Sequence, residues 1–176
     1  MKAFLIALLT ATMLIPAVDN AEGQPLYEIK LELSSDISDS GGDDDHPAIV
    51  GGLGWYHWER VLFGGYCSFE KKETGYWGKS NLWGLGAYGE YHFKTESPVV
   101  PYLAASMGFL DGDEDDDTVF TLSGGAGLKV SLTKILSVSA QLDLNWADSE
   151  VYDYEWEDKD GSSTDVTANI GLRYLY

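Results

Sequence analysis

The chain has 176 residues, 44% of them apolar, a formal net charge of −18 and one cysteine, Cys67. The length allows one domain and a targeting segment, and the apolar content argues against a disordered chain. An acidic chain is repelled by nucleic-acid phosphates, so we expect no nucleic-acid partner, and a single cysteine excludes an intrachain disulfide.

The first 21 residues have the pattern of a secretory signal peptide. Lys2 supplies a positive charge, an apolar run begins at Ala3, and small residues follow at Ala17 and Ala21. The run is shorter than the roughly 20 residues that a membrane-spanning helix needs. We predict a signal peptide over residues 1–21 and one mature domain over residues 22–176, with the exact cleavage point left open.

Eight segments of alternating polarity follow. They cover residues 27–33, 48–58, 61–70, 83–93, 102–109, 120–131, 136–146 and 166–176. Because side chains alternate across a strand, each segment has an apolar and a polar face. The faces are clearest in residues 136–146, where Leu142 and Leu144 alternate with Gln141 and Asp143.

One segment, residues 48–58, is a clear strand with ambiguous faces. Trp55 and Trp58 fall on opposite sides of it by simple alternation.

The connections between these segments alternate in length. Long polar connections cover residues 34–47, 73–80, 111–118 and 148–165, and short ones lie near residues 59–60, 95–99 and 133–135. This order predicts an all-β fold, an eight-stranded antiparallel up-and-down transmembrane β-barrel with long loops on one side and both termini on the other.

Alternation alone does not say which face of the barrel is outside. In a soluble barrel the apolar face lines a cavity for a small apolar ligand, whereas in a membrane barrel it meets lipid. Aromatic residues near the strand ends favour the membrane barrel, namely Tyr27, Phe69, Phe93, Phe109, Phe120, Trp146, Tyr174 and Tyr176.

The polar faces carry small residues and a few charges of both signs, namely Glu28, Lys30, Glu32, Glu70, Glu90, Lys129, Asp143 and Arg173. This composition suits the narrow interior of a barrel, where buried ions must pair. Eight strands leave an interior that side chains fill. We expect Arg173 and Lys129 to pair there with Glu90, Asp143 and Glu70 in a buried polar plug, without an open pore.

Two segments are specific marks of a family resemblance, residues 101–109 (PYLAASMGF) and the end of the chain, residues 171–176 (GLRYLY). With them the whole mature chain resembles the small eight-stranded outer-membrane barrels of the outer-membrane protein A, W and X kind. The resemblance implies location in the outer membrane. It also implies recognition of the last strand, through Ile170, Leu172, Tyr174 and Tyr176, by the barrel-assembly machinery.

Acidic runs occur in the long connections. Residues 111–117 begin like a calcium loop, but Asp116 stands where that loop needs glycine and Leu122 where it needs a bidentate glutamate. We interpret this run, residues 43–45 and residues 155–158 as solvated loops and expect no built metal site. Contact with lipopolysaccharide phosphates through shared divalent cations is a hypothesis that stays open.

The histidines offer no hydrolase pattern. His46, His57 and His92 have no serine within two residues, and we expect His92 and His57 to join the interior polar network. We therefore predict no catalytic residue, no cofactor and no metal, and a monomeric barrel with a structural or surface-interaction role through its acidic loops. The alternatives are a soluble barrel that binds an apolar ligand, a minor small-solute channel, or a lipid-modifying enzyme.

Overall fold

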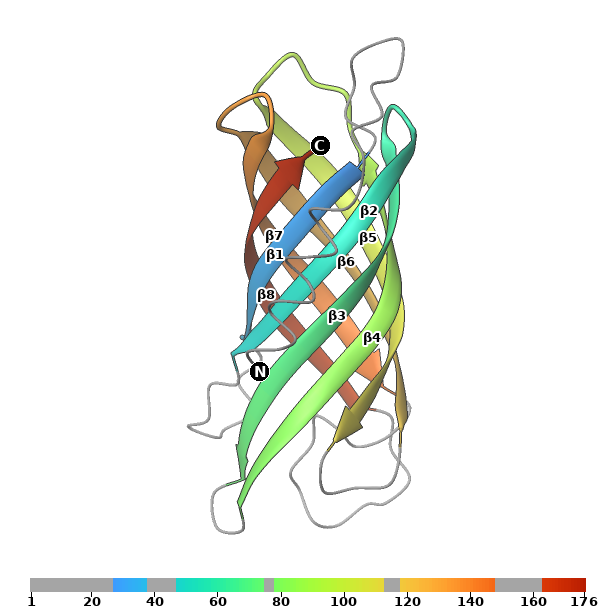
Figure 1. The fold of residues 1–176 in the computed structure, drawn as a ribbon, viewed down its shortest axis with the longest axis vertical. Coiled ribbons are helices and arrows are strands. Elements are labelled where there is room, and N and C mark those ends of the chain that lie inside the picture. Colours follow the sequence, from blue (N-terminus) through green and yellow to red (C-terminus); the bar gives the residue numbers. More distant parts are fainter. Residues whose placement is uncertain (1–26, 38–46, 75–77, 113–117, 148–162) are drawn as a thin grey trace.

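The chain folds into a closed barrel in a computed structural model that describes residues 27–37, 47–74, 78–112, 118–147 and 163–176. The strands of this part are β1 (Tyr27–Asp36), β2 (Ala48–Trp58), β3 (Val61–Thr74), β4 (Gly78–His92), β5 (Val99–Gly112), β6 (Val119–Ser131), β7 (Leu136–Ala147) and β8 (Ser163–Leu175). Sequential strands pair antiparallel, and β1 also pairs with β8, so the predicted eight-stranded up-and-down barrel is confirmed (Figure 1). In the described residues no helix is long and apolar enough to cross a membrane.

The hairpin of β3 and β4 is longer than the sequence predicts. The prediction of a long polar connection over residues 73–80 is wrong, because the ladder continues to the pair Thr74↔Gly78. The polarity pattern detects a strand only as far as its apolar face extends. Strand pairing depends on backbone N–H and C=O groups, so it can continue beyond that point. The two strands therefore continue past the last apolar residues.

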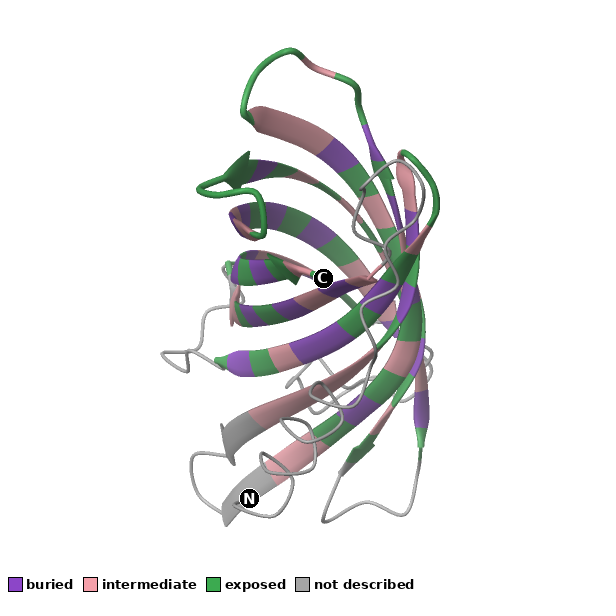
Figure 2. Cartoon of the chain, turned by 45° about the horizontal axis from the view of Figure 1, so that its top comes forward, coloured by how far each residue is buried: buried purple, intermediate pink, exposed green. Residues whose placement is uncertain are grey.

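The apolar face of the barrel points outward. Leu85 is 70% exposed and Ile170 is 65% exposed, whereas Glu28 and Arg173 on the inward face are fully buried. Buried and exposed positions alternate along the strands (Figure 2). Soluble proteins rarely expose a continuous apolar belt of this kind to water, so the belt faces lipid. The alternative of a soluble barrel is therefore wrong.

A β-bulge at the end of β2 explains its ambiguous faces. The register with β3 shifts between Tyr56 and Trp58, so one residue is inserted there. Trp55 and Trp58 consequently both point outward, 49% and 62% exposed. His57 is exposed and packs edge-on against Trp58, with ring centroids 4.3 Å apart. The prediction that His57 joins the interior network is therefore wrong.

Aromatic side chains gather at both ends of the apolar belt. At the end with the short turns, Tyr91 packs on Phe93 and Tyr174 on Tyr176. At the end with the long connections the pairs are Phe69 with Trp83 and Phe109 with Phe120. These two girdles are expected where a barrel crosses the two interfaces of a bilayer.

Glycines on the inward faces make room for the large interior rings. A Cβ atom added at Gly64 would lie 2.6 Å from a ring carbon of Tyr88, and one added at Gly54 would lie 2.6 Å from its hydroxyl. Tyr66 lies in the same way over Gly86 and Gly108. The glycine-rich strands therefore serve interior packing.

Candidate functional site

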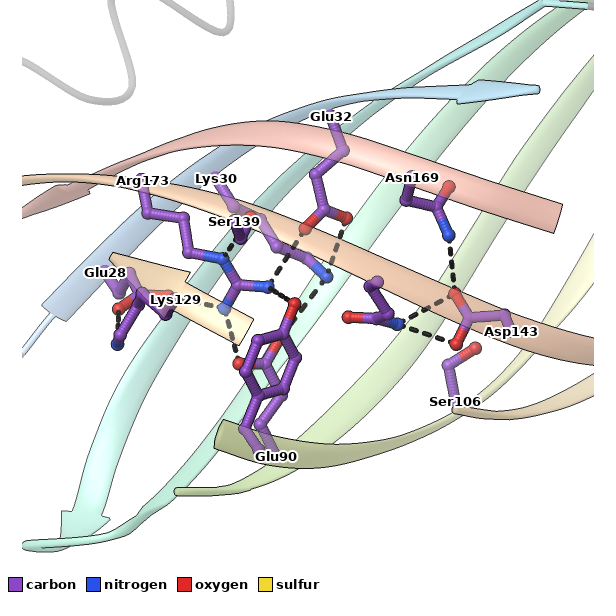
Figure 3. A network of polar contacts seen from close by, with 12 residues as sticks. Glu28, Lys30, Glu32, Glu90, Ser106, Lys129, Ser139, Asp143, Asn169 and Arg173 are labelled. Atoms are coloured by element: carbon purple, nitrogen blue, oxygen red, sulfur yellow. Dashed lines mark hydrogen bonds and ion pairs between the residues drawn. The ribbon is translucent and has the colours of Figure 1, made fainter. Parts of the chain in front are cut away.

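The barrel interior holds a cluster of six charged residues, which we call the ion cluster. Its members are Glu28, Lys30 and Glu32 of β1, Glu90 of β4, Lys129 of β6 and Arg173 of β8 (Figure 3). Alternation places all six on the inward faces of their strands, and each is at most 6% exposed. Three carboxylates face three cations, so the ion cluster is formally neutral.

Arg173 is the centre of the ion cluster. Its Nη1 donates to Oε1 of Glu28 at 3.0 Å and to Oε2 of Glu90, and its Nη2 donates to Oε1 of Glu32 at 3.0 Å. Nη2 also donates to the Tyr102 hydroxyl at 2.9 Å, and Nε donates to Ser139 Oγ at 2.9 Å. The planar guanidinium has five N–H donors in a fixed fork, which suits one cation among several carboxylates.

Lys129 closes a second group of contacts around Glu28. Its Nζ lies 3.0 Å from Oε2 of Glu28 and donates to the Tyr56 hydroxyl at 2.8 Å. The same hydroxyl donates to Oε2 of Glu28 at 2.9 Å. Glu28 is therefore neutralised from both sides, by Lys129 and by Arg173.

Lys30 and His92 complete the surroundings of Glu90. Lys30 Nζ lies 3.2 Å from Glu32 and 3.6 Å from Glu90, and 4.0 Å from the centre of the Tyr88 ring. His92 Nε2 lies 3.0 Å from Oε2 of Glu90, as the sequence predicts for an interior network. Its ring stacks on Tyr102 with centroids 5.5 Å apart. Ionic and aromatic side chains together fill this section of the barrel.

Of the predicted pairings, that of Arg173 with Glu90 is confirmed. Lys129 lies in the same cluster, but its carboxylate partner is Glu28, which the prediction did not name. Asp143 and Glu70 lie toward the end of the barrel with the long connections. Asp143 accepts hydrogen bonds from Gln141 Nε2 at 2.7 and 2.8 Å and from Asn169 Nδ2 at 2.6 Å (Figure 3). Glu70 lies near the far end of β3, opposite Ala48 and Leu82.

The sequence placed the three β1 charges on the inward polar face, but the predicted pairing of the plug did not include them. Glu28, Lys30 and Glu32 are three inward positions in a row, and the register places Lys30 opposite Arg173 of β8. The signal was the alternation of β1 itself, combined with the pairing of first and last strands that closure requires.

Several predicted features lie outside the described residues. These are the signal peptide over residues 1–21, His46, residues 43–45, residues 113–117 and residues 155–158. Within the described part of the chain, no three His, Cys, Asp or Glu side chains are placed to hold a metal ion.

The negative charge of the chain is concentrated in three connections at one end of the barrel. The sequence places four acidic residues in residues 38–46, five in residues 113–117 and seven in residues 148–162, against one cation, Lys159. These segments join β1 to β2, β5 to β6 and β7 to β8, so in an up-and-down barrel they leave from the same end. The short turns, the start of β1 and the end of β8 lie at the other end (Figure 1).

The chain is similar to proteins of known structure that are barrels of this kind. Neisserial surface protein A (NspA) is 18% identical with a TM-score of 0.62, and the match covers 85% of this chain and 96% of that one. A de novo designed transmembrane β-barrel is 14% identical with a TM-score of 0.52 and coverages of 87% and 97%. OprG from Pseudomonas aeruginosa is 11% identical with a TM-score of 0.50 and the same coverages.

These identities show a shared fold. No curated protein sequence matches the chain significantly. A family model described as outer membrane protein beta-barrel domain matches residues 4–174, which is nearly the whole chain. With an apolar belt outside, two aromatic girdles and a charged interior, the chain belongs to this family and is a protein of the outer membrane.

Proposed function

We propose that this protein is a non-catalytic outer-membrane barrel with a structural or surface-interaction role, exerted through its acidic external loops. The partner at that surface is lipopolysaccharide, whose phosphates share divalent cations with the loop carboxylates. The barrel is a monomer within outer-membrane lipid.

The ion cluster carries this proposal. Glu28 and Arg173 are 0% exposed, so water does not reach these groups where they meet inside the barrel. A filled and neutral section supports a closed barrel over a small-solute channel. The interactions of the protein are then made at its surface.

The charge of the connections supports the choice of partner. Blocks of like charge are solvated and repel one another unless counterions are present. Divalent cations bind carboxylate and phosphate oxygens, so they can bridge the loops to an anionic glycolipid.

The surroundings of the described histidines support a role without catalysis. His92 is buried against Glu90 and Tyr102, and His57 lies outside against Trp58. A nucleophilic site needs a base within hydrogen-bond reach of an accessible serine or cysteine.

The last strand supports recognition by the barrel-assembly machinery. Ile170, Leu172, Tyr174 and Tyr176 alternate on its outward face and are all exposed. We expect Tyr176→Ser to lower the amount of folded barrel in the outer membrane.

Binding to lipopolysaccharide vesicles tests the proposal. Purified barrel in phospholipid nanodiscs should bind them in the presence of Mg²⁺ and release them on addition of EDTA. Replacing the acidic residues of 113–117 by their amides should weaken binding, whereas Glu96→Gln in a short turn, as the matched control, should not.

If binding to the lipopolysaccharide vesicles changes neither with Mg²⁺ nor with the loop substitutions, the proposed role of the loops is wrong. Two further measurements test the other parts of the proposal. Steady conductance in planar bilayers would instead support the channel, and a changed mass of the lipopolysaccharide after incubation would support an enzyme.

A further inference from the structure

A shallow, open pocket lies on the outer surface where the short turn between β2 and β3 meets the end of β4. It has a volume of about 420 Å³ and is lined by Trp58, Glu59, Arg60, Val61 and Tyr91. Trp58 is 62% exposed and Tyr91 is 42% exposed, and both belong to the outward apolar face. The pocket therefore lies at the edge of the lipid-facing belt, at the level of the aromatic girdle on the short-turn side.

The walls of the pocket are held by contacts on both sides. The bulge in β2 turns Trp58 outward, and the edge of His57 packs against it. Tyr91 is opposite Val61 in the ladder and packs against Phe93 with ring centroids 5.2 Å apart. The turn is tied to β4 by a hydrogen bond from the backbone N–H of His92 to the carbonyl oxygen of Arg60, 2.8 Å long. The turn is therefore fixed against β4, and each of the two rings has an aromatic neighbour.

The lining is mostly apolar, and two residues of opposite charge, adjacent in the chain, border it. Arg60 offers a guanidinium, which is well suited to a phosphate, and Glu59 offers a carboxylate, which accepts hydrogen bonds from an ammonium group. A lipid with only a negative charge would meet repulsion from Glu59. A headgroup with a phosphate beside a primary ammonium would match both residues.

The remaining wall suits the rest of such a lipid. Trp58, Val61 and Tyr91 give an apolar surface that continues into the outward belt of the barrel. Aromatic rings with one apolar side and one polar end are at home at the boundary between headgroups and acyl chains. A lipid bound there can keep its chains in the bilayer and its headgroup in the turn.

We propose that this pocket binds the headgroup of a zwitterionic phospholipid of the phosphatidylethanolamine type, with its phosphate on Arg60 and its ammonium on Glu59. The barrel would hold this lipid at the short-turn end, opposite the end where the acidic connections lie. The site is independent of the proposed role of those connections.

Native mass spectrometry of the intact barrel tests the proposal. The barrel is released from nanodiscs that contain equal amounts of phosphatidylethanolamine and phosphatidylglycerol, and the lipid that stays bound is identified. We expect retained phosphatidylethanolamine to exceed phosphatidylglycerol by about threefold or more, the scale of a partly exposed charge pair. Arg60→Gln should remove most of the retained lipid, and Glu59→Gln should bring the two lipids close to equal retention.

Matched variants in the other short turns separate this site from general lipid attraction. Lys134→Gln and Glu96→Gln change the same kinds of charge outside the pocket and should leave retention unchanged. Gel mobility before and after heating shows that each variant is folded. Equal retention of the two lipids by the unmodified barrel, or equal effects of Arg60→Gln and Lys134→Gln, would overturn the proposal in favour of unselective surrounding lipid.

Discussion

Removal of the central cation should destabilise the barrel strongly. Arg173→Met replaces a fully buried guanidinium, which donates to Glu28, Glu32, Glu90, Tyr102 and Ser139, by an apolar side chain of similar length. Three carboxylates then share the two remaining lysines. Loss of one partner of a buried ion pair costs about 3–5 kcal/mol, because the remaining charges have already been taken out of water. We expect the free energy of unfolding to fall by this amount.

Urea titration in phospholipid vesicles measures this loss. Tryptophan fluorescence and heat-dependent gel mobility give two readouts of the same transition, and their agreement supports two-state analysis. Lys134→Gln is the matched control, since it removes an exposed cation in a turn, and it should change the free energy of unfolding by less than about 0.5 kcal/mol.

A second variant tests whether charge balance, and not the loss of Arg173 by itself, determines the stability of the interior. Arg173→Met combined with Glu90→Gln leaves two carboxylates with two lysines, so charge balance returns. The double variant should therefore be more stable than the sum of the two single losses, with a coupling of about 1 kcal/mol or more. A loss below about 1 kcal/mol for Arg173→Met, or strict additivity in the double variant, would refute charge balance as the basis of interior stability.

Two other predictions concern packing and the lipid face. Gly64→Ala places a methyl group against the backbone carbonyl oxygen of Leu53 and the Tyr88 ring, and it should cost about 1–3 kcal/mol in the same titration. Gly124→Ala, with no atom within 4 Å of its added Cβ, should be close to neutral; similar losses for both would contradict the role of the inward glycines. Leu142→Arg, in the middle of β7 and 56% exposed, should cost about 2–4 kcal/mol, and Leu132→Arg in the turn after β6 about 0–1 kcal/mol. Equal costs at these two positions would argue against a bilayer around the belt.

The strands can be predicted from the sequence because the alternation of polar and apolar residues is visible within each segment, without knowledge of its neighbours. The faces of β7 needed only the alternation of Leu142 and Leu144 with polar neighbours, and closure followed from the number of strands. The bulge in β2 is different, since one inserted residue reverses every later side chain, and no local polarity marks the insertion. In the sequence, Trp55 and Trp58 fall on opposite faces by simple alternation, but nothing there identifies a bulge as the reason.

The membership of the ion cluster depends on how far each strand is displaced along its neighbours. Lys30 meets Arg173 through the register of the seam between β1 and β8, which is set by the whole barrel. Asp143 and Arg173 share an inward polarity, but they lie at different depths, so polarity alone paired them wrongly. The sequence predicts which charges face the interior, but it does not predict the position of each one along the barrel axis.

The position of the ion cluster across the seam couples neutralisation to the last step of folding. Arg173 and Glu28 are separated by 145 positions in the chain, and β1 alone supplies half of the ion cluster. Before β1 and β8 join, Arg173 has no contact with Glu28 or Glu32 across the seam, and an open sheet would carry these groups into the membrane apart from each other. Contacts of such long sequence separation form late. The ion cluster thus raises the free energy of an open barrel in lipid and stabilises only the closed one. This difference favours all-or-none closure of the barrel.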